Sequence, residues 1–214
     1  MKKYYANLRR DYHQAALDES NMASDPVKQF EVWLNDAIDK ELELPNAMVL
    51  ATVTEQGRPA ARYVLLKELD ANGFVFFTHS ASDKGRQLAN NAFAALVFYW
   101  GPLHRQVRVE GSVTMVTAAE ADAYFATRPY GSRLAVWTAP QSDVIPDRAF
   151  LQDRMQALQQ QYPDQNNVPR PDDWTGYRLR PDKMEFWQGQ EDRLHDRIAY
   201  TRQQDGWLIQ RLAP

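Results

Sequence analysis

Five residues near the C-terminal end, RLHDR from Arg193 to Arg197, gather two arginines and a histidine in one short segment. On an extended strand, side chains alternate between faces, so Arg193, His195 and Arg197 would project from one side and Leu194 and Asp196 from the other. Three cationic or near-cationic groups on one face repel one another unless an anionic or π-rich group lies between them. The pattern fits either a solvated edge strand or a face that binds such a group, with Asp196 in a structural role.

A second candidate is the segment RYVLLK, which carries Arg62 and Lys67 five residues apart. If this segment is one strand, the two side chains project to opposite faces of the sheet. One strand could then bind two different anions, one on each face. The alternative is that both residues are strand-end charges whose side chains extend into water.

The segment YFATRPYGS places Tyr124, Arg128 and Ser132 at positions i, i+4 and i+8. On a helix these positions form one stripe that carries a phenol, a guanidinium and a hydroxyl. Pro129 should end the helix near Arg128, so we expect Ser132 in the turn that follows. A positive charge combined with several directed hydrogen bonds is what a phosphate monoester requires, although such trios also occur on ordinary protein surfaces.

A third candidate for anion binding is HSASDK, in which Ser80, Ser82 and Lys84 accompany the start of a helix predicted over 83–90. The free backbone N–H groups and the dipole at a helix N-terminus favour anions. Ordinary N-capping explains the serines equally well. Trp187, on a predicted strand, fits either a core position or a platform under a bound ring.

The composition bounds the class of protein. The chain has 214 residues, enough for one domain, and its 44% hydrophobic content can supply a sizeable core. It has no cysteine, which excludes disulfides and thiolate chemistry, and no apolar run that approaches the roughly 20 residues of a transmembrane helix. The net charge of −3 argues against nucleic-acid binding, and the basic start lacks the apolar segment of a secretory signal. We therefore expect a cytoplasmic protein that binds neither nucleic acid nor a membrane.

Several common catalytic motifs are missing from the sequence. It contains neither the G-x-G-x-x-G nor the G-x-x-x-x-G-K-[ST] nucleotide loop, and neither H-E-x-x-H nor G-x-S-x-G. The four histidines are scattered without ligand spacing, so we expect no metal site. The candidate sites that remain are the local clusters of cationic and polar residues that could bind anions.

The order of the predicted elements indicates the fold that must position these clusters. Residues 1–24 are polar and mixed, and we expect a mobile N-terminal arm followed by a single domain over 25–214. Asp25 and Pro26 fit the N-cap and the first residue of a helix. Strands joined by short turns indicate an α+β fold built on an antiparallel, Greek-key-like barrel with flanking helices. The expected strands are 47–54, 60–69, 74–78, 93–100, 105–116, 176–189 and a final pair within 197–214, and the expected helices are 24–45, 83–90, 117–129 and 147–162.

Together, RYVLLK, RQVRVEG, YFATRP followed by GS, APQS, EFWQG and RLHDR resemble the pyridoxine/pyridoxamine 5′-phosphate oxidase family. The resemblance extends from RRDY near the start to the closing QRLAP, over nearly the whole chain. It implies an FMN-binding split β-barrel that works as a homodimer with FMN at the subunit interface. It also implies oxidation of pyridoxine 5′-phosphate and pyridoxamine 5′-phosphate to pyridoxal 5′-phosphate. Hydride would pass to the flavin, and dioxygen would be converted to hydrogen peroxide, with release of ammonia from the amine.

The resemblance assigns cofactor contacts to residues along the whole chain. Arg62 and Lys84 look like ligands of the FMN phosphate, with Gln141 and Ser142 contributed by the partner subunit. Gln106 would hydrogen-bond the flavin ring, and Trp187 would lie against it. The full set implied for FMN is Arg62, Tyr63, Val64, Leu65, Leu66, Lys67, Phe77, Thr78, Lys84, Gln106, Gln141, Ser142, Trp187 and Arg197.

The resemblance assigns the second anion site to the substrate. Lys67, Tyr124, Arg128 and Ser132 would hold its phosphate, and the RRDY segment of the arm would close over it. Catalytic roles fall on three residues, Arg193, His195 and Arg197, whose side chains would lie at the pyridine ring and the flavin. The full set implied for the substrate is Arg9, Arg10, Asp11, Tyr12, Lys67, Tyr124, Arg128, Ser132, Arg193, Leu194 and His195.

Two positions depart from the family pattern. Asp83 stands before Lys84 where many members have arginine, and a carboxylate there would repel the FMN phosphate, by roughly 1 kcal/mol if partly solvated. Arg86, one helical turn away, is a candidate to compensate. Gln190 replaces a glycine that is common after WQG and so bears on a tight turn.

Three alternatives to this oxidase are open. A split-barrel flavin reductase that acts on another heterocycle needs the flavin residues but not Lys67, Tyr124, Arg128 and Ser132 together. A non-enzymatic protein that binds FMN or pyridoxal phosphate would take up its ligand in stoichiometric amount and produce no peroxide. A barrel that binds single-stranded nucleic acid is a more distant alternative, for which salt-sensitive oligonucleotide binding would be the sign.

Overall fold

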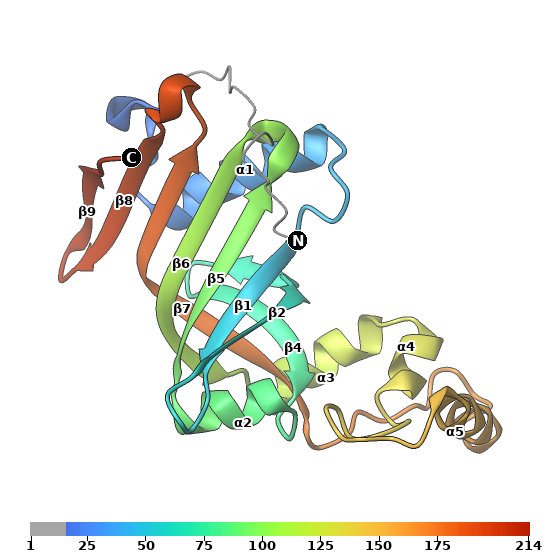
Figure 1. Cartoon of the computed structure of the whole chain (residues 1–214). Coiled ribbons are helices and arrows are strands. Elements are labelled where there is room, and N and C mark those ends of the chain that lie inside the picture. Colours follow the sequence, from blue (N-terminus) through green and yellow to red (C-terminus); the bar gives the residue numbers. More distant parts are fainter. Residues whose placement is uncertain (1–15) are drawn as a thin grey trace, which may run out of the picture.

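A computed structural model describes residues 16–214 of the chain (Figure 1). Within these residues the strands are β1 (Ala47–Val53), β2 (Pro59–Leu65), β3 (Glu68–Asp70), β4 (Gly73–His79), β5 (Phe93–Trp100), β6 (Arg105–Met115), β7 (Trp174–Gln188), β8 (Asp196–Gln203) and β9 (Gly206–Arg211). The helices are α1 (Pro26–Asp39), α2 (Asp83–Asn90), α3 (Ala118–Thr127), α4 (Tyr130–Ala135) and α5 (Arg148–Gln161), with short 3-10 turns η1 (Glu19–Asn21), η2 (Gly101–Leu103) and η3 (Glu191–Arg193).

The strands form one curled antiparallel sheet in the order β2-β1-β5-β6-β7-β4-β3, with β8 paired to β7 and β9 to β8. The pairing of β1 with β5 and of β4 with β7 joins strands that are not consecutive, as expected for a Greek-key-like arrangement. In Figure 1 the helices α3, α4 and α5 gather at one end of the sheet, whereas β8 and β9 lie at the other. The predicted α+β fold with an antiparallel split barrel is confirmed.

The long strand β7 is where the sheet divides. Residues 174–179 of β7 pair with β4, whereas residues 183–188 pair with β8. Between these halves the register with β6 shifts at Glu110 and Gly111, which leaves Asp182 as an extra residue on β7. A bulge of this kind bends a strand and increases its twist. The two halves of β7 therefore extend into two different edges of the sheet.

The connection from β2 to β3 closes the curl. These strands lie at opposite edges of the sheet, yet only Leu66 and Lys67 separate them in the chain. The single strand predicted over 60–69 is therefore wrong: its first half pairs with β1 and its second half with β4. Because β2 ends at Leu65, Arg62 and Lys67 do not lie on opposite faces of one strand.

The segment RLHDR is also not one strand. Arg193 ends the turn η3 in a left-handed backbone conformation (φ 62°), and β8 begins only at Asp196. The predicted alternation of Arg193, His195 and Arg197 on one face is therefore wrong. Asp192 (φ 50°) has a left-handed backbone as well, so the segment begins within the turn that joins β7 to β8.

Helix α1 and the inner face of the sheet form the main core. The Asp25 side chain accepts hydrogen bonds from the backbone of Val27 and Lys28, so it caps the helix as predicted. Phe30 and Trp33 are almost fully buried among aromatic side chains of β4, β5 and β7. A second, smaller core lies between α3, α4, α5 and the start of β7; its buried members are Phe125, Leu134, Leu158, Val168 and Trp174.

The segment assigned to an N-terminal arm is described only from residue 16 onward. Leu17 and Met22 pack against the main core, and the backbone N–H of Leu17 donates to the Asp196 carboxylate (3.0 Å). Arg211, at the end of β9, forms an ion pair with Glu19 (2.8 Å). These contacts place residues 17–22 beside the start of β8.

Gly111, at the register shift on β6, provides a test of this fold. A Cβ added there would lie 1.9 Å from the backbone oxygen of Arg180, which cannot move away as a side-chain tip could. We expect Gly111→Ala to lower the free energy of unfolding by about 2 kcal/mol or more, measured by urea denaturation. Gly131→Ala, in helix α4 with no atom within 4 Å of the new Cβ, is the control and should be neutral or slightly stabilising.

Candidate functional site

A large cavity opens where the closing edge of the sheet meets helices α3 and α4. Its volume is about 830 Å³, within the range of small-molecule sites. Strand β2 contributes Arg62 to this cavity, and the connection from β2 to β3 contributes Lys67. Of the residues assigned to FMN or substrate, those that line this cavity are Arg62, Tyr63, Val64, Leu65, Lys67, Phe77, Thr78, Lys84, Tyr124, Arg128, Ser132 and Gln141.

Within residues 62–67, all of which were assigned to FMN, Leu66 is the residue that does not line the cavity. Its side chain is 5% exposed and belongs to the main core. Its backbone N–H donates to the carbonyl of Asn46, and its carbonyl accepts from the Asn46 amide. The assignment of Leu66 to the cofactor set is therefore not supported by its position.

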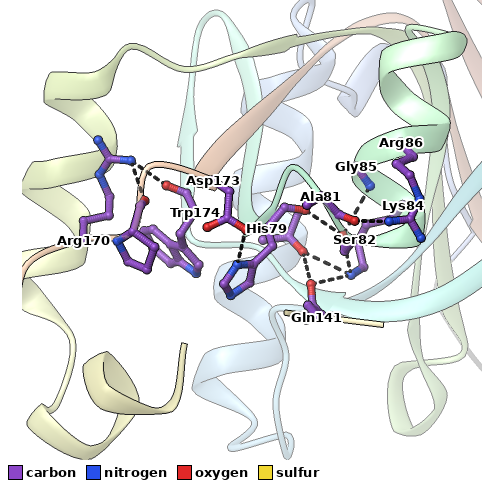
Figure 2. A network of polar contacts seen from close by, with 12 residues as sticks. His79, Ala81, Ser82, Lys84, Gly85, Arg86, Gln141, Arg170, Asp173 and Trp174 are labelled. Carbon is purple, nitrogen blue, oxygen red and sulfur yellow. Dashed lines mark hydrogen bonds and ion pairs between the residues drawn. The ribbon is translucent and has the colours of Figure 1, made fainter. Parts of the chain in front are cut away.

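Lys84, at the start of α2, is held in place by oxygen acceptors (Figure 2). Its ammonium donates to the side-chain oxygens of Thr78 (3.1 Å), Ser82 (3.3 Å) and Gln141 (2.9 Å). The Ser82 hydroxyl also accepts from the backbone N–H of Gly85 and so caps the helix. These bonds fix a positive charge at a helix N-terminus, which is the arrangement that favours a phosphate.

Arg62 supplies a second cation to the part of the cavity wall that carries Lys84. Its guanidinium donates to Thr52 Oγ1 (2.6 Å) and to Gln87 Oε1 (2.9 Å), which leaves it braced by β1 and α2. Burial lowers the pKa of Arg62, and burial together with the nearby Arg62 charge lowers the pKa of Lys84. Two partly desolvated cations side by side would be stabilised by an anion between them. We call Arg62, Lys84, Thr78 and Gln141 the first subsite.

Gln141 and Ser142 belong to the same chain as Lys84. The resemblance implied that they reach the cofactor from the partner subunit, and the structure corrects this. Gln141 bonds Lys84 and Thr78, and the Ser142 hydroxyl accepts from the backbone N–H of Asp83 (3.2 Å). The loop after α4 folds back over the N-terminus of α2, which brings both residues to the first subsite.

Asp83, one of the two departures from the family pattern, has a charged partner. Arg86 forms an ion pair with Asp83 (2.5 Å), one helical turn along α2, and also donates to the carbonyl of Ala81. Both side chains are more than half exposed. The pairing partly neutralises the carboxylate that precedes Lys84, and an effect of Arg86 on FMN affinity stays a prediction.

Arg128 and the aromatic rings beneath it form the opposite wall. The guanidinium lies 4.8 Å from the ring centre of Trp174, and Phe77 stacks on Tyr124 (4.0 Å) and on Trp174 (5.2 Å). One guanidinium nitrogen of Arg128, Nη1, is buried and has no hydrogen-bond partner among residues 16–214. Burial lowers the pKa of Arg128 and raises that of Tyr124.

Ser132 completes this group from an element that was not predicted. Pro129 is the N-cap of a further short helix, α4, so Ser132 lies on a helix and not in a turn. It lines the same cavity as Lys67, Tyr124 and Arg128. We call Lys67, Tyr124, Arg128 and Ser132 the second subsite. The four residues line one cavity, and their binding of a phosphate stays a prediction.

Three of the predicted flavin residues lie elsewhere, on neighbouring strands. Gln106 pairs with Trp187, and Trp187 pairs with Arg197, across β6, β7 and β8. Trp187 lies twelve residues along β7 from Thr175, the partner of Thr78 at the cavity (175 to 187). At 3.2–3.4 Å per residue this is about 40 Å of strand. One chain therefore holds its predicted flavin residues in two separate groups.

The residues around RLHDR complete the second of these groups. The His195 ring lies 4.8 Å from that of Trp187, and its Nδ1 accepts from the backbone N–H of Gln190 (3.1 Å). Burial and the nearby Arg193 charge lower the pKa of His195. Arg193 and Leu194 are exposed on the turn. We call Gln106, Trp187, Arg193, His195 and Arg197 the C-terminal group.

Glu185 fixes Arg197 and was not identified as a functional residue from the sequence. Arg197 donates to both oxygens of this buried carboxylate (2.9 and 3.1 Å), which raises its pKa. Because side chains alternate along β7, Glu185 shares a face with Trp187, and that periodicity was the available signal. The pair holds the guanidinium of Arg197 beside Trp187.

Asp196 has the structural role that was expected of it. It is buried, and its carboxylate accepts from Arg211 (2.5 Å) and from the side-chain amide of Gln190 (2.8 Å). Gln190 itself has an ordinary extended backbone (φ −130°), so this turn does not require the glycine common in the family.

Arg9, Arg10, Asp11 and Tyr12 lie outside the described residues. Among residues 16–214, no group of three or more histidine, aspartate or glutamate side chains could hold a metal ion. In the same range, no helix is long and apolar enough to span a membrane.

The fold and the site together define a class of protein. A curled antiparallel sheet that divides along one strand, with a cavity beside its closing edge, is typical of a split β-barrel. The chain belongs to the pyridoxine/pyridoxamine 5′-phosphate oxidase family: residues 34–162 match the model described as pyridoxamine 5′-phosphate oxidase. Residues 174–214 match the C-terminal dimerisation region of pyridoxine 5′-phosphate oxidase, which supports assembly as a homodimer.

Full-length relatives agree with this assignment. The chain is 54% identical over 209 residues to a pyridoxine/pyridoxamine 5′-phosphate oxidase of Thermosynechococcus vestitus, with 98% of each chain covered. It is 52% identical over 212 residues to the protein of the same name from Burkholderia multivorans, again with 98% of each covered. The family is one of oxidoreductases.

Two solved structures share the fold. PhzG from Burkholderia lata 383, in complex with tetrahydrophenazine-1-carboxylic acid, superposes with a TM-score of 0.89 at 30% identity and covers 96% of this chain and 100% of its own. A pyridoxamine 5′-phosphate oxidase-related, FMN-binding protein from Nostoc punctiforme has a TM-score of 0.71 at 18% identity, with 91% and 99% covered. The second likeness concerns the fold alone.

Proposed function

We propose that this chain is an FMN-dependent oxidase that converts pyridoxine 5′-phosphate and pyridoxamine 5′-phosphate to pyridoxal 5′-phosphate. Dioxygen is the electron acceptor, hydrogen peroxide is released, and the amine substrate also yields ammonia. The observation that carries the proposal is the presence of two cationic subsites in one cavity. Two phosphorylated ligands, a cofactor and a substrate, account for both. Relatives at about 50% identity carry the corresponding name.

The residues present fit FMN. The first subsite offers two desolvated cations at the N-terminus of α2, and its hydrogen bonds are already formed among Thr78, Lys84 and Gln141. The cavity is large enough for a flat ring as well as a phosphate. When bound there, FMN would accept the hydride and pass electrons to dioxygen. The protein then has to bind and orient the substrate.

The second subsite would hold the phosphate of the substrate. The unpaired Nη1 of Arg128 is an unused donor at the cavity wall, where charge-assisted hydrogen bonds are strong. Lys67, Tyr124 and Ser132 add one charge and two hydroxyl groups. Fixing the phosphate orients the ring to which it is attached, and this lowers the entropic cost of reaching the reactive geometry.

The C-terminal group would complete the site from the second subunit. Within one chain it is separated from the cavity by about 40 Å of strand β7. The match of residues 174–214 to a dimerisation region supports a homodimer, and in this proposal the C-terminal group of the partner chain lies over the cavity. Arg193 and His195 would then contact the substrate ring, and Trp187 and Arg197 would lie against the flavin.

The test is aerobic turnover by purified protein supplemented with FMN. Pyridoxine 5′-phosphate and pyridoxamine 5′-phosphate are supplied in turn, and pyridoxal phosphate and peroxide are followed together. The proposal expects both products in equal amounts. A flavin-loaded protein that is inert with both vitamers but oxidises tetrahydrophenazine-1-carboxylic acid, the ligand of the PhzG structure, would instead favour the alternative of another heterocycle. Stoichiometric binding without peroxide would favour a carrier.

The Asp83–Arg86 pair gives a smaller prediction about the cofactor. In Arg86→Ala, Asp83 loses its ion pair and its charge faces the FMN phosphate more fully. We expect the FMN dissociation constant to rise about two- to fivefold, because an exposed pair contributes little. Quenching of FMN fluorescence during titration measures it. Asp83→Asn combined with Arg86→Ala is the control and should restore the wild-type affinity; a persistent loss would mean that Arg86 acts on FMN directly.

A further inference from the structure

Residues 170–174, which lead into β7, form a short turn that lies beside His79 (Figure 2). The guanidinium of Arg170 donates to the backbone carbonyls of Pro171 (3.2 Å) and Trp174 (2.7 Å), and it is anchored to Asp122 of α3 (2.6 Å). The backbone N–H of Trp174 donates to the carbonyl of Pro171 (3.0 Å). These bonds make the segment a compact turn fixed to helix α3.

One end of this turn is tied to the first subsite. The Asp173 carboxylate lies 3.0 Å from Nδ1 of His79, and the Asp173 carbonyl accepts from the backbone of Ser80 (2.6 Å). His79 is 6% exposed, and its carbonyl accepts from the hydroxyl of Ser82, one of the acceptors that hold Lys84. The position of Lys84 is thus linked to the turn by consecutive hydrogen bonds.

The next residue of the turn, Trp174, supports the second subsite. The Trp174 indole is 4% exposed and lies against the Arg128 guanidinium, 4.8 Å from the ring centre. Phe125 is the other ring that Arg128 approaches, at 5.8 Å. Because Nη1 of Arg128 has no hydrogen bond in the described chain, ring contacts are what fix its direction on that side. A desolvated cation over an indole face is a favourable contact.

We propose that Trp174 is a positioning residue that aims Arg128 at the substrate phosphate. Through residues 170–173 the same turn fixes the distance between this guanidinium and Lys84 of the first subsite. The turn then selects substrates whose phosphate and ring fit that separation. This inference rests on the proposed function, because it takes the anion at Arg128 to be the phosphate of the substrate.

The experiment measures binding as well as turnover, with pyridoxal 5′-phosphate as the probe on FMN-loaded protein. We expect Trp174→Leu to weaken probe binding about tenfold and to raise KM for pyridoxine 5′-phosphate similarly, with kcat and FMN content within twofold of wild type. Trp174→Phe keeps an aromatic face and should recover most of this loss. The double variant Trp174→Leu, Arg128→Ala should bind no more weakly than Arg128→Ala alone.

A matched control separates positioning from loss of core packing. Leu158→Ala removes a side chain of the same small core that comes from helix α5. It should lower Tm at least as much as Trp174→Leu does, yet leave probe binding within twofold of wild type. The proposal is overturned if Leu158→Ala weakens binding as much as Trp174→Leu, or if the effects of Trp174→Leu and Arg128→Ala are additive.

The wild-type protein distinguishes this inference from the proposed function. If it binds the probe but produces no peroxide from either vitamer, the oxidase fails, while the ratio of binding constants among the variants still decides the role of Trp174. If wild-type protein binds neither the probe nor inorganic phosphate, Arg128 has no anion to hold and both are overturned.

Discussion

A mixed dimer that pairs an Arg128→Ala chain with an Arg193→Ala chain should regain activity that both homodimers lack. In the first chain the cavity is impaired, and in the second the C-terminal group is impaired. If each site combines the cavity of one chain with the C-terminal group of its partner, one of the two sites in the mixed dimer contains neither substitution. We expect about half of the wild-type kcat/KM per dimer, from the symmetry of a two-fold assembly.

The experiment uses two affinity tags on co-expressed chains, so that the mixed dimer is purified free of both parents. Each parent homodimer should fall to roughly one tenth or less of wild-type kcat/KM, from loss of a charge-assisted contact. The control pairs Arg128→Ala with Lys67→Ala, two residues of the same cavity. Both of its sites then contain an impaired cavity, and no recovery is expected. Recovery in the control, or none in the first pair, would contradict a site shared between chains.

The fold was largely predictable because its determinants are local. Asp25 and Thr117 cap their helices with bonds to residues two or three positions along the chain, and the turns between paired strands are short. The single strand predicted over 60–69 failed for a tertiary reason. Its pattern is continuous, but Leu66 faces the core and the chain passes there from one edge of the sheet to the other.

The residues that line the site could be predicted from the sequence better than their arrangement in space. Four residues spread from Lys67 to Ser132 share one cavity, as expected from their types and from the resemblance. Their grouping into subsites depends on long-range contacts, since Gln141 reaches Lys84 from 57 residues away. Trp174 and Glu185 were missed because an aromatic or a carboxylate at a buried strand position looks like ordinary core until its partner is known.

The prediction that RLHDR forms one strand was wrong because the segment has the pattern of a strand but begins in a turn. The left-handed backbone at Arg193 (φ 62°) has no signal in the residue type, since arginine rarely adopts it. Strand alternation alone placed Asp196 on the face away from the site. In the structure its carboxylate accepts a hydrogen bond from the side-chain amide of Gln190 and so anchors the turn. Its carboxylate therefore holds in place the segment that carries Arg193 and His195.

Replacement of Arg193 by alanine should lower kcat/KM for pyridoxine 5′-phosphate about 100-fold while FMN content stays at the wild-type level. The Arg193 side chain is exposed on its turn and makes no ion pair within residues 16–214, so its loss costs the fold little. Its expected role is to stabilise charge on the substrate as hydride leaves, and removal of one such donor typically costs 10²–10³ in rate. Steady-state kinetics and flavin absorbance measure the two quantities. Equal loss of both would contradict this role.

The same substitution should also move the pH profile. The Arg193 charge is one of the two causes that lower the pKa of His195, the larger being burial. Without this charge the pKa of His195 rises, so the imidazole gains its proton at a higher pH. If kcat/KM requires neutral His195, the acid limb of its pH profile should move to higher pH in Arg193→Ala. Arg193→Lys keeps the charge and should leave that limb in place even if its rate is reduced. If the limb does not move in the alanine variant, kcat/KM does not depend on the protonation of His195. The charge of Arg193 would then act on the substrate alone.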